Sequence, residues 1–125
     1  MLVVDDHPVN RTLLVRLLRR SGFAPEQAAN GIEAVTLWQQ WQPHLILMDL
    51  MMPGWSGYEA TRLIRTTEAF IQKPPTPIIA LTAEELSTLA HQLHTVGFDS
   101  LMTTPVRPDI LDRKSVVIGK SVDKG

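Results

Sequence analysis

Short apolar runs alternate with longer amphipathic segments along the chain. The runs Met1–Val4, Leu45–Met48 and Ile78–Leu81 are continuous and apolar, which is typical of strands covered on both faces. Between and after them, apolar residues recur with the period of a helix that buries one side. This pattern predicts helices over Pro8–Ser21, Ile32–Trp41, Tyr58–Thr67 and Glu84–Thr95.

The first two helices have identifiable faces and ends. In the first, the predicted apolar stripe consists of Val9, Leu13, Leu14, Leu17 and Leu18, and Gly22 supplies the stop. In the second, the apolar side consists of Ile32, Val35, Leu37 and Trp38. Trp38 and Trp41 are both predicted to pack against the rest of the domain, whereas Trp55 falls in a loop marked by Pro53, Gly54 and Gly57.

Three further segments are less regular. Phe23–Ala29 is a weak strand candidate, and Pro25, which has no backbone donor, favours the edge of a sheet for it. Leu101–Met102 predicts a short last strand. Pro108 can open a final helix, with Ile110, Leu111, Val117 and Ile118 on one face, although Ser115–Ile118 also has the composition of a strand unrelated to the domain. We expect a domain over 1–118 and a linker or appended tail over 119–125.

A strand followed by a helix, repeated five times, predicts an α/β fold. Parallel strands joined by right-handed crossovers place helices on both faces of the sheet. In an open sheet of this kind, ligands bind beyond the carboxyl ends of the strands. The residues that directly follow each apolar run are therefore the candidates for chemistry.

Composition narrows the classes of protein that remain. The 125 residues suit one domain, and 12 basic against 13 acidic residues give a net charge of −1, which excludes a strongly basic nucleic-acid binder. Without cysteine there is no disulfide scaffold or thiolate metal site, and a reducing, cytoplasmic location is expected. No apolar run is long enough for a membrane span, and no basic leader is visible. The start of the first strand at Met1 suggests a piece excised from a longer protein.

Carboxylates follow the predicted strands. Asp5 and Asp6 end the first, Asp49 ends the third, and the hydroxyl of Thr82 ends the fourth. An isolated Asp at such a place often caps a helix, but Asp49 is followed by apolar residues and starts no turn. Three carboxylates held together repel one another, and Mg²⁺ relieves that repulsion while binding phosphate oxygens. A carboxylate beside a metal-bound phosphoryl group is a possible nucleophile.

These residues lie in segments that resemble the receiver (response-regulator) domain of two-component signalling. The resemblance runs from Met1 to about Leu111, and it rests on Val3–Asp6, Leu45–Pro53, Ile79–Ala83 and Thr104–Pro105. It implies a flavodoxin-like (βα)5 fold with a five-stranded parallel sheet of order 2-1-3-4-5, which agrees with Pro25 on an edge strand. Asp6–Arg11 and Gly57–Arg65 are similar to receivers attached to hybrid sensor histidine kinases.

The resemblance also implies roles. Asp49 would accept a phosphoryl group from the phosphohistidine of a histidine kinase or a histidine phosphotransfer domain. Asp6, Asp49 and the backbone carbonyl of Met51 would ligate Mg²⁺, and Asp5 would act mainly through water. The Thr82 hydroxyl and the Ala83 amide would contact the phosphoryl group. The chain would be a signalling module and not a stand-alone enzyme, with no contact to nucleic acid or membrane.

The same resemblance implies an output surface. In receivers, the fourth helix, the fifth strand and the fifth helix serve for output or homodimerisation. In this chain that surface would include Leu89, His91 and Leu101 or their neighbours.

Two positions depart from the family pattern. Receivers place a Lys where this chain has Thr104, and an aromatic residue where it has Leu101. A hydroxyl carries no charge for the phosphoryl oxygens, so an alternative remains open in which the domain is a degenerate receiver, an interaction module with impaired switching. A phosphatase with an aspartyl nucleophile would need an acidic residue at the position of Met51, and is set aside.

Overall fold

The computed structural model describes residues 1–82 and 87–103, and within this part the side chains of residues 87–91 are not described. The elements, in chain order, are β1 (Leu2–Val4), α1 (Pro8–Arg20), β2 (Glu26–Ala28), α2 (Gly31–Trp41), β3 (Ile46–Asp49), α3 (Gly57–Ile71), β4 (Ile78–Thr82), α4 (Ser87–Val96) and β5 (Ser100–Thr103).

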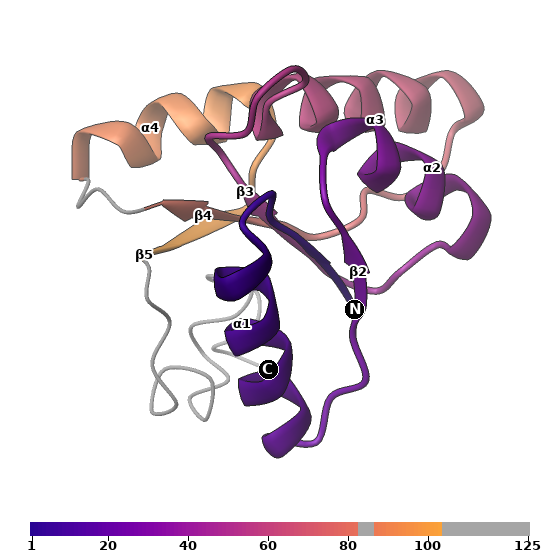
Figure 1. The fold of residues 1–125 in the computed structure, drawn as a ribbon. Coiled ribbons are helices and arrows are strands. Elements are labelled where there is room, and N and C mark those ends of the chain that lie inside the picture. Colours follow the sequence, from indigo (N-terminus) through magenta and orange to yellow (C-terminus); the bar gives the residue numbers. More distant parts are fainter. Residues whose placement is uncertain (83–86, 104–125) are drawn as a thin grey trace.

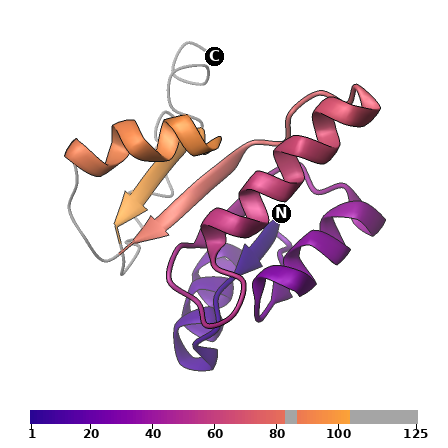
Figure 2. The same cartoon turned by 90° about the horizontal axis from the view of Figure 1, so that it is seen from above.

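The strands form one parallel sheet of order β2-β1-β3-β4-β5. Helix α1 lies on one face, and α2, α3 and α4 lie on the other (Figures 1 and 2). The predicted flavodoxin-like fold, the strand order and the helices on both faces are therefore confirmed. Strand β2 is at an edge and begins directly after Pro25, as its missing donor predicts. The expected last helix from Pro108 lies outside the described residues.

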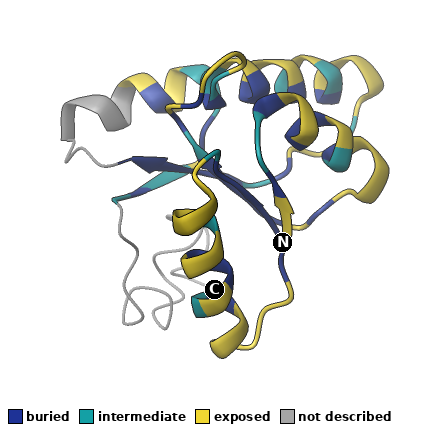
Figure 3. Ribbon diagram, viewed as in Figure 1, coloured by how far each residue is buried: buried dark blue, intermediate teal, exposed yellow. Residues whose placement is uncertain are grey.

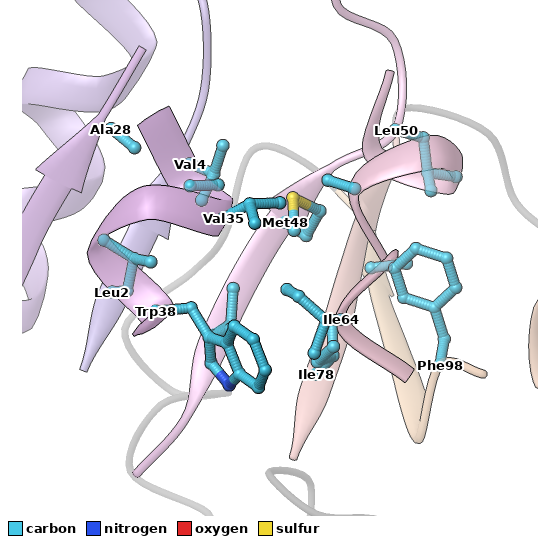
Figure 4. Close-up of a cluster of buried hydrophobic side chains, with 14 of the residues drawn as sticks. Leu2, Val4, Ala28, Val35, Trp38, Met48, Leu50, Ile64, Ile78 and Phe98 are labelled. Atoms are coloured by element: carbon cyan, nitrogen blue, oxygen red, sulfur yellow. The ribbon is translucent and has the colours of Figure 1, made fainter. Parts of the chain in front are cut away.

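Alternation along the central strands divides the core into two layers. Leu2 and Val4 point to the α2 and α3 side, where they belong to the same buried cluster as Trp38 and Ile64 (Figure 4). Val3 points to the opposite layer, which α1 covers. Because successive strand residues face opposite sides, a strand buried on both faces must be apolar throughout. Burial is accordingly continuous in the central strands and confined to one side of each helix (Figure 3).

The predicted apolar face of α1 is partly wrong. Val9 and Leu13 are 70% and 57% exposed, while Leu14, Val15 and Leu18 contact the sheet. The helix is rotated so that a narrower stripe, including the unpredicted Val15, is covered. The predicted stop is confirmed, because Gly22 has a φ of 96°. The Phe23 N–H donates to the Leu18 carbonyl and the Gly22 N–H to the Arg19 carbonyl, which is a Schellman motif.

The prediction for the tryptophans of α2 is confirmed for one and wrong for the other. Trp38 is buried, and its indole N–H donates to the Thr76 hydroxyl at 3.0 Å. Trp41, the last residue of the helix, is 42% exposed, and Ile32, near its start, is 60% exposed. The buried residues of α2 share one side of the helix, and they are Gly31, Ala34, Val35 and Trp38.

A charged network joins α3 to the amino ends of β4 and β5. Arg65 donates to Glu68 at 2.7 Å, to Asp99 at 3.0 Å and to the Gly97 carbonyl at 2.9 Å. Glu68 is 3% exposed, and its second oxygen accepts from the Thr76 N–H at 2.7 Å. A buried carboxylate is costly without a cationic partner, so this end of the sheet depends on the guanidinium.

We expect Arg65→Met to lower the free energy of unfolding by about 3 kcal/mol, because it leaves the Glu68 carboxylate buried without a cation. The measurement is urea denaturation at neutral pH. Arg62→Met, on the exposed side of the same helix, is the matched control and should change stability little. Equal stabilities of the two variants would contradict the assignment.

Candidate functional site

The carboxyl ends of the central strands bring the predicted site residues together. Val4 on β1 pairs with Met48 on β3, so Asp5 and Asp49, which follow them, leave the sheet at the same level. Asp49 in turn pairs with Leu81, which places Thr82 beside it at the end of β4. The parallel register thus converts distant sequence positions into one cluster.

Asp5 is buried and tied down on several sides. Its side chain accepts from the His7 N–H at 2.9 Å, and its own N–H donates to the Ala28 carbonyl at 3.1 Å. Its carbonyl accepts from Arg11 at 2.7 Å. These bonds fix the turn that follows β1, so the adjacent Asp6 is presented from a rigid backbone.

Asp6 has an oxygen without a partner. Its Oδ1 is buried and has no hydrogen bond among the residues that the structure describes. The ring of His7 is exposed, and its Nδ1 lies 3.8 Å from that oxygen, which is beyond hydrogen-bond range. One potential ligand atom from each of Asp5, Asp6 and His7 lies within 4.8 Å of the others. A buried carboxylate oxygen lacking a donor is suited to a cation.

Asp49 adjoins this trio through Asp5. Burial, followed by the negative charge of Asp5, raises the pKa of Asp49 from 3.8 to about 7, with smaller contributions from a side-chain hydrogen bond with Asp5 and the charge of Asp6. The Met51 N–H donates to Asp49 Oδ1 at 3.2 Å and opposes this pKa shift. The site therefore holds more negative charge than its own donors neutralise.

The donor set suits a hard divalent cation. The carboxylates of Asp5 and Asp6 belong to one group of possible metal ligands, and Asp49 is next to Asp5. All three offer the oxygen ligands that Mg²⁺ prefers, and the buried Oδ1 of Asp6 has no hydrogen-bond donor among the described residues. A cation here would relieve the repulsion that raises the Asp49 pKa. The residues present therefore fit the metal that the sequence suggests.

Sequence reasoning missed Arg11. Its guanidinium donates to the Asp5 carbonyl and, at 3.2 Å, to Gln27 on the edge strand β2. It thereby joins the first turn of α1 to the ends of β1 and β2. The available signal was its position one helical turn after His7, whose carbonyl accepts from the Arg11 N–H.

The structure describes some of the remaining predicted site residues and not others. Thr82 is buried at the end of β4, next to Asp49. Ala83 and Thr104 lie outside the described residues, as do the side chains of Leu89 and His91. Leu101, on β5, is partly buried and packs against the core layer of α2 and α3.

Comparison with known proteins identifies the class. Residues 1–114 match the response regulator receiver domain family, so the chain belongs to that family. Sensor protein GacS of Pseudomonas syringae pv. syringae is 38% identical over 85% of the chain, and sensor histidine kinase RcsC of Salmonella typhimurium is 32% identical over 99%. The chain spans 12% and 13% of the lengths of these relatives.

Solved structures agree with this membership. One is the co-crystal structure of the Saccharomyces cerevisiae histidine phosphotransfer protein Ypd1 and the receiver domain of its downstream response regulator Ssk1. The match has a TM-score of 0.84 and 31% identity, and it covers 97% of this chain and 89% of that one. Another is the Vibrio cholerae chemotaxis protein CheY4, with a TM-score of 0.79, 28% identity and coverage of 90% and 91%. Among the described residues, no helix has the length and apolar character to cross a membrane.

We expect the raised pKa of Asp49 to make the stability of the metal-free protein depend on pH. In the unfolded chain Asp49 ionises near pH 3.8, whereas in the folded protein it keeps its proton up to a pKa of about 7. Between these values the unfolded state binds fewer protons, so the free energy of unfolding falls as the pH rises. Because the site is partly hydrated, we expect a fall of about 1 to 2 kcal/mol, less than the full pKa shift implies.

The measurement is urea denaturation in a chelator from pH 4 to pH 7.5. Asp49→Asn should remove most of this fall and be more stable than the wild type at neutral pH. Glu26→Gln, an exposed carboxylate on β2, is the control and should keep the wild-type slope. Parallel curves for wild type and Asp49→Asn would contradict the expectation.

Proposed function

We propose that this receiver domain is a phosphoacceptor, in which Asp49 takes a phosphoryl group from a phosphohistidine in the presence of Mg²⁺. The observation that carries the proposal is the excess of negative charge at one edge of the sheet. Burial, followed by the charge of Asp5 and more weakly that of Asp6, raises the pKa of Asp49 to about 7, and a buried oxygen of Asp6 has no donor among the described residues. A phosphoacceptor carboxylate needs a neighbouring cation, and these groups provide its ligands.

Asp6, Asp49 and the Met51 carbonyl would hold the ion directly, and Asp5 would hold it through water. When bound, Mg²⁺ neutralises the carboxylates and the oxygens of the incoming phosphoryl group. The Met51 N–H, bonded to Asp49 Oδ1, keeps the carboxylate in one orientation. Positioning and charge neutralisation supply most of the catalysis in phosphoryl transfer, so no further acid or base is required of the chain.

In the proposed step, a carboxylate oxygen of Asp49 forms a bond to phosphorus while the bond from phosphorus to the donor imidazole nitrogen breaks. The bonding pair returns to the imidazole, which remains as the neutral ring or takes a proton from solvent. The Thr82 hydroxyl would donate to one phosphoryl oxygen from the end of β4, and the Ala83 amide would donate to another. The product is an aspartyl phosphate with added negative charge beside Thr82.

The comparisons support a choice of partner. The receiver of Ssk1, to which this chain is similar, has been crystallised with the histidine phosphotransfer protein Ypd1, and the relatives include sensor histidine kinases. We therefore propose a histidine kinase or a histidine phosphotransfer domain as the donor, in the cytoplasm, with a hybrid histidine kinase as the parent protein. A homodimer through α4, β5 and the following segment is a further possibility that gel filtration of the phosphorylated domain tests.

Treatment with acetyl phosphate and Mg²⁺ should add one phosphoryl mass to the intact protein, because Asp49 is accessible to a small donor. Intact-mass spectrometry is the measurement. Asp49→Asn should stay unmodified, and the wild type in a chelator should also stay unmodified. A wild-type protein that gains no mass with Mg²⁺ present would refute phosphoacceptance.

The degenerate-receiver alternative makes a different prediction for metal binding. Trp55 lies in the loop after Asp49 and is partly exposed, so its fluorescence should be quenched in a saturable way as Mg²⁺ is added. Trp55→Phe should abolish the response, whereas Trp41→Phe, at the far end of α2, should retain it. No response in the wild type would favour an interaction module whose acidic site is no longer used.

A further inference from the structure

The loop between β3 and α3 is closed at its base. The Gly57 N–H donates to the Leu50 carbonyl at 3.2 Å, so the two ends of the loop are joined. Gly57 lies directly against the Asp49 carbonyl, where a Cβ atom would overlap it. Ser56 and Glu59 form a reciprocal capping box that fixes the start of α3. The loop that includes Met51 and Trp55 is therefore held at its base.

The start of α2 is fixed equally well. The Asn30 side chain accepts from the Glu33 N–H at 2.8 Å, and the Glu33 side chain accepts from the Ala29 N–H at 2.7 Å. These reciprocal bonds satisfy donors that the first turn would otherwise leave unpaired. Gly31, the first residue of the helix, is buried between them and the loop.

Gly31 and Trp55 approach each other too closely for a side chain at residue 31. A Cβ atom on Gly31 would lie 2.8 Å from the Trp55 Cβ and 2.8 Å from the Trp55 carbonyl oxygen. Both atoms belong to the backbone or its first side-chain carbon, so neither can swing away. Gly31 is in the helix and is absent from the glycines with positive φ, so its backbone conformation is open to any residue. Glycine is required at residue 31 because any side chain there would overlap the loop at Trp55.

A methyl group at residue 31 would therefore displace the loop and not the helix. Because the loop is joined at Leu50 and Gly57, we expect a displacement of Trp55 to be passed along the loop to Met51. The Met51 N–H bond to Asp49 at 3.2 Å has little tolerance for such a movement. Displacement of a ligand-bearing loop by a few tenths of an ångström is enough to weaken metal binding.

We infer that Gly31 is a positioning residue for the acidic site, setting through Trp55 the place of the loop that supplies the Met51 carbonyl. This inference rests on the proposed function, since it concerns the binding of Mg²⁺ at Asp6, Asp49 and Met51. It assigns to the start of α2 a part in metal affinity although none of its residues is proposed to touch the ion.

The test is calorimetric titration of the full chain with Mg²⁺. Gly31→Ala should lower the affinity about three- to tenfold. At saturating Mg²⁺, its rate of modification by acetyl phosphate should return to near the wild-type value, because Asp49 itself is intact. Ile32→Ala, on the exposed side of the same helical turn, is the matched control and should bind Mg²⁺ as the wild type does.

A second variant covers the case in which Gly31→Ala fails to fold. Trp55→Gly removes the Trp55 Cβ from the contact and leaves the carbonyl oxygen in place. It should lower Mg²⁺ affinity in the same direction, with α2 untouched, because the loop loses the side chain that lies against Gly31. Wild-type affinity in a folded Gly31→Ala protein would overturn the inference, as would wild-type affinity in Trp55→Gly. A loss of the modification rate that persists at saturating Mg²⁺ would also overturn it. Failure of the wild type to bind Mg²⁺ would instead refute the proposed function, so the two failures are distinct.

Discussion

The repulsion among carboxylates at one edge of the sheet is the constraint on which the site depends. Central strands that are apolar on both faces must lie inside, and their parallel register ends β1 and β3 at the same level. The packing of the strands, and not any interaction between the two carboxylates, therefore places Asp5 close to Asp49. The two apolar layers supply the free energy that keeps these carboxylates close.

Buried carboxylates have different partners at the amino ends and at the carboxyl ends of the strands. At the amino ends of β4 and β5, Arg65 contacts the carboxylates of Glu68 and Asp99, so a buried charge is neutralised within the chain. At the carboxyl ends, Arg11 is near the acidic residues but donates to the Asp5 carbonyl and leaves the carboxylates to another partner. The buried charge at the amino ends is thus neutralised within the chain, whereas Arg11 does not neutralise the carboxylates at the carboxyl ends.

Features that follow from the local pattern of apolar and polar residues can be predicted from the sequence. Features that depend on how distant segments pack cannot. The central strands, the edge position of β2 and the carboxylates after β1 and β3 all follow from apolar runs and the residues that end them. The face of α1 does not, because its rotation against the sheet places Val15 inside and Val9 outside. The contact between Gly31 and Trp55 could not be predicted either, because nothing in the sequence of either segment indicates that they lie close together.

Strand β2 determines how the domain can meet other chains. It has three residues, it follows Pro25, and the side chains of Glu26 and Gln27 are exposed, with Gln27 bonded to Arg11. A short, charged border preceded by proline is a poor template for adding a foreign strand. Recognition at this border through backbone pairing is therefore disfavoured.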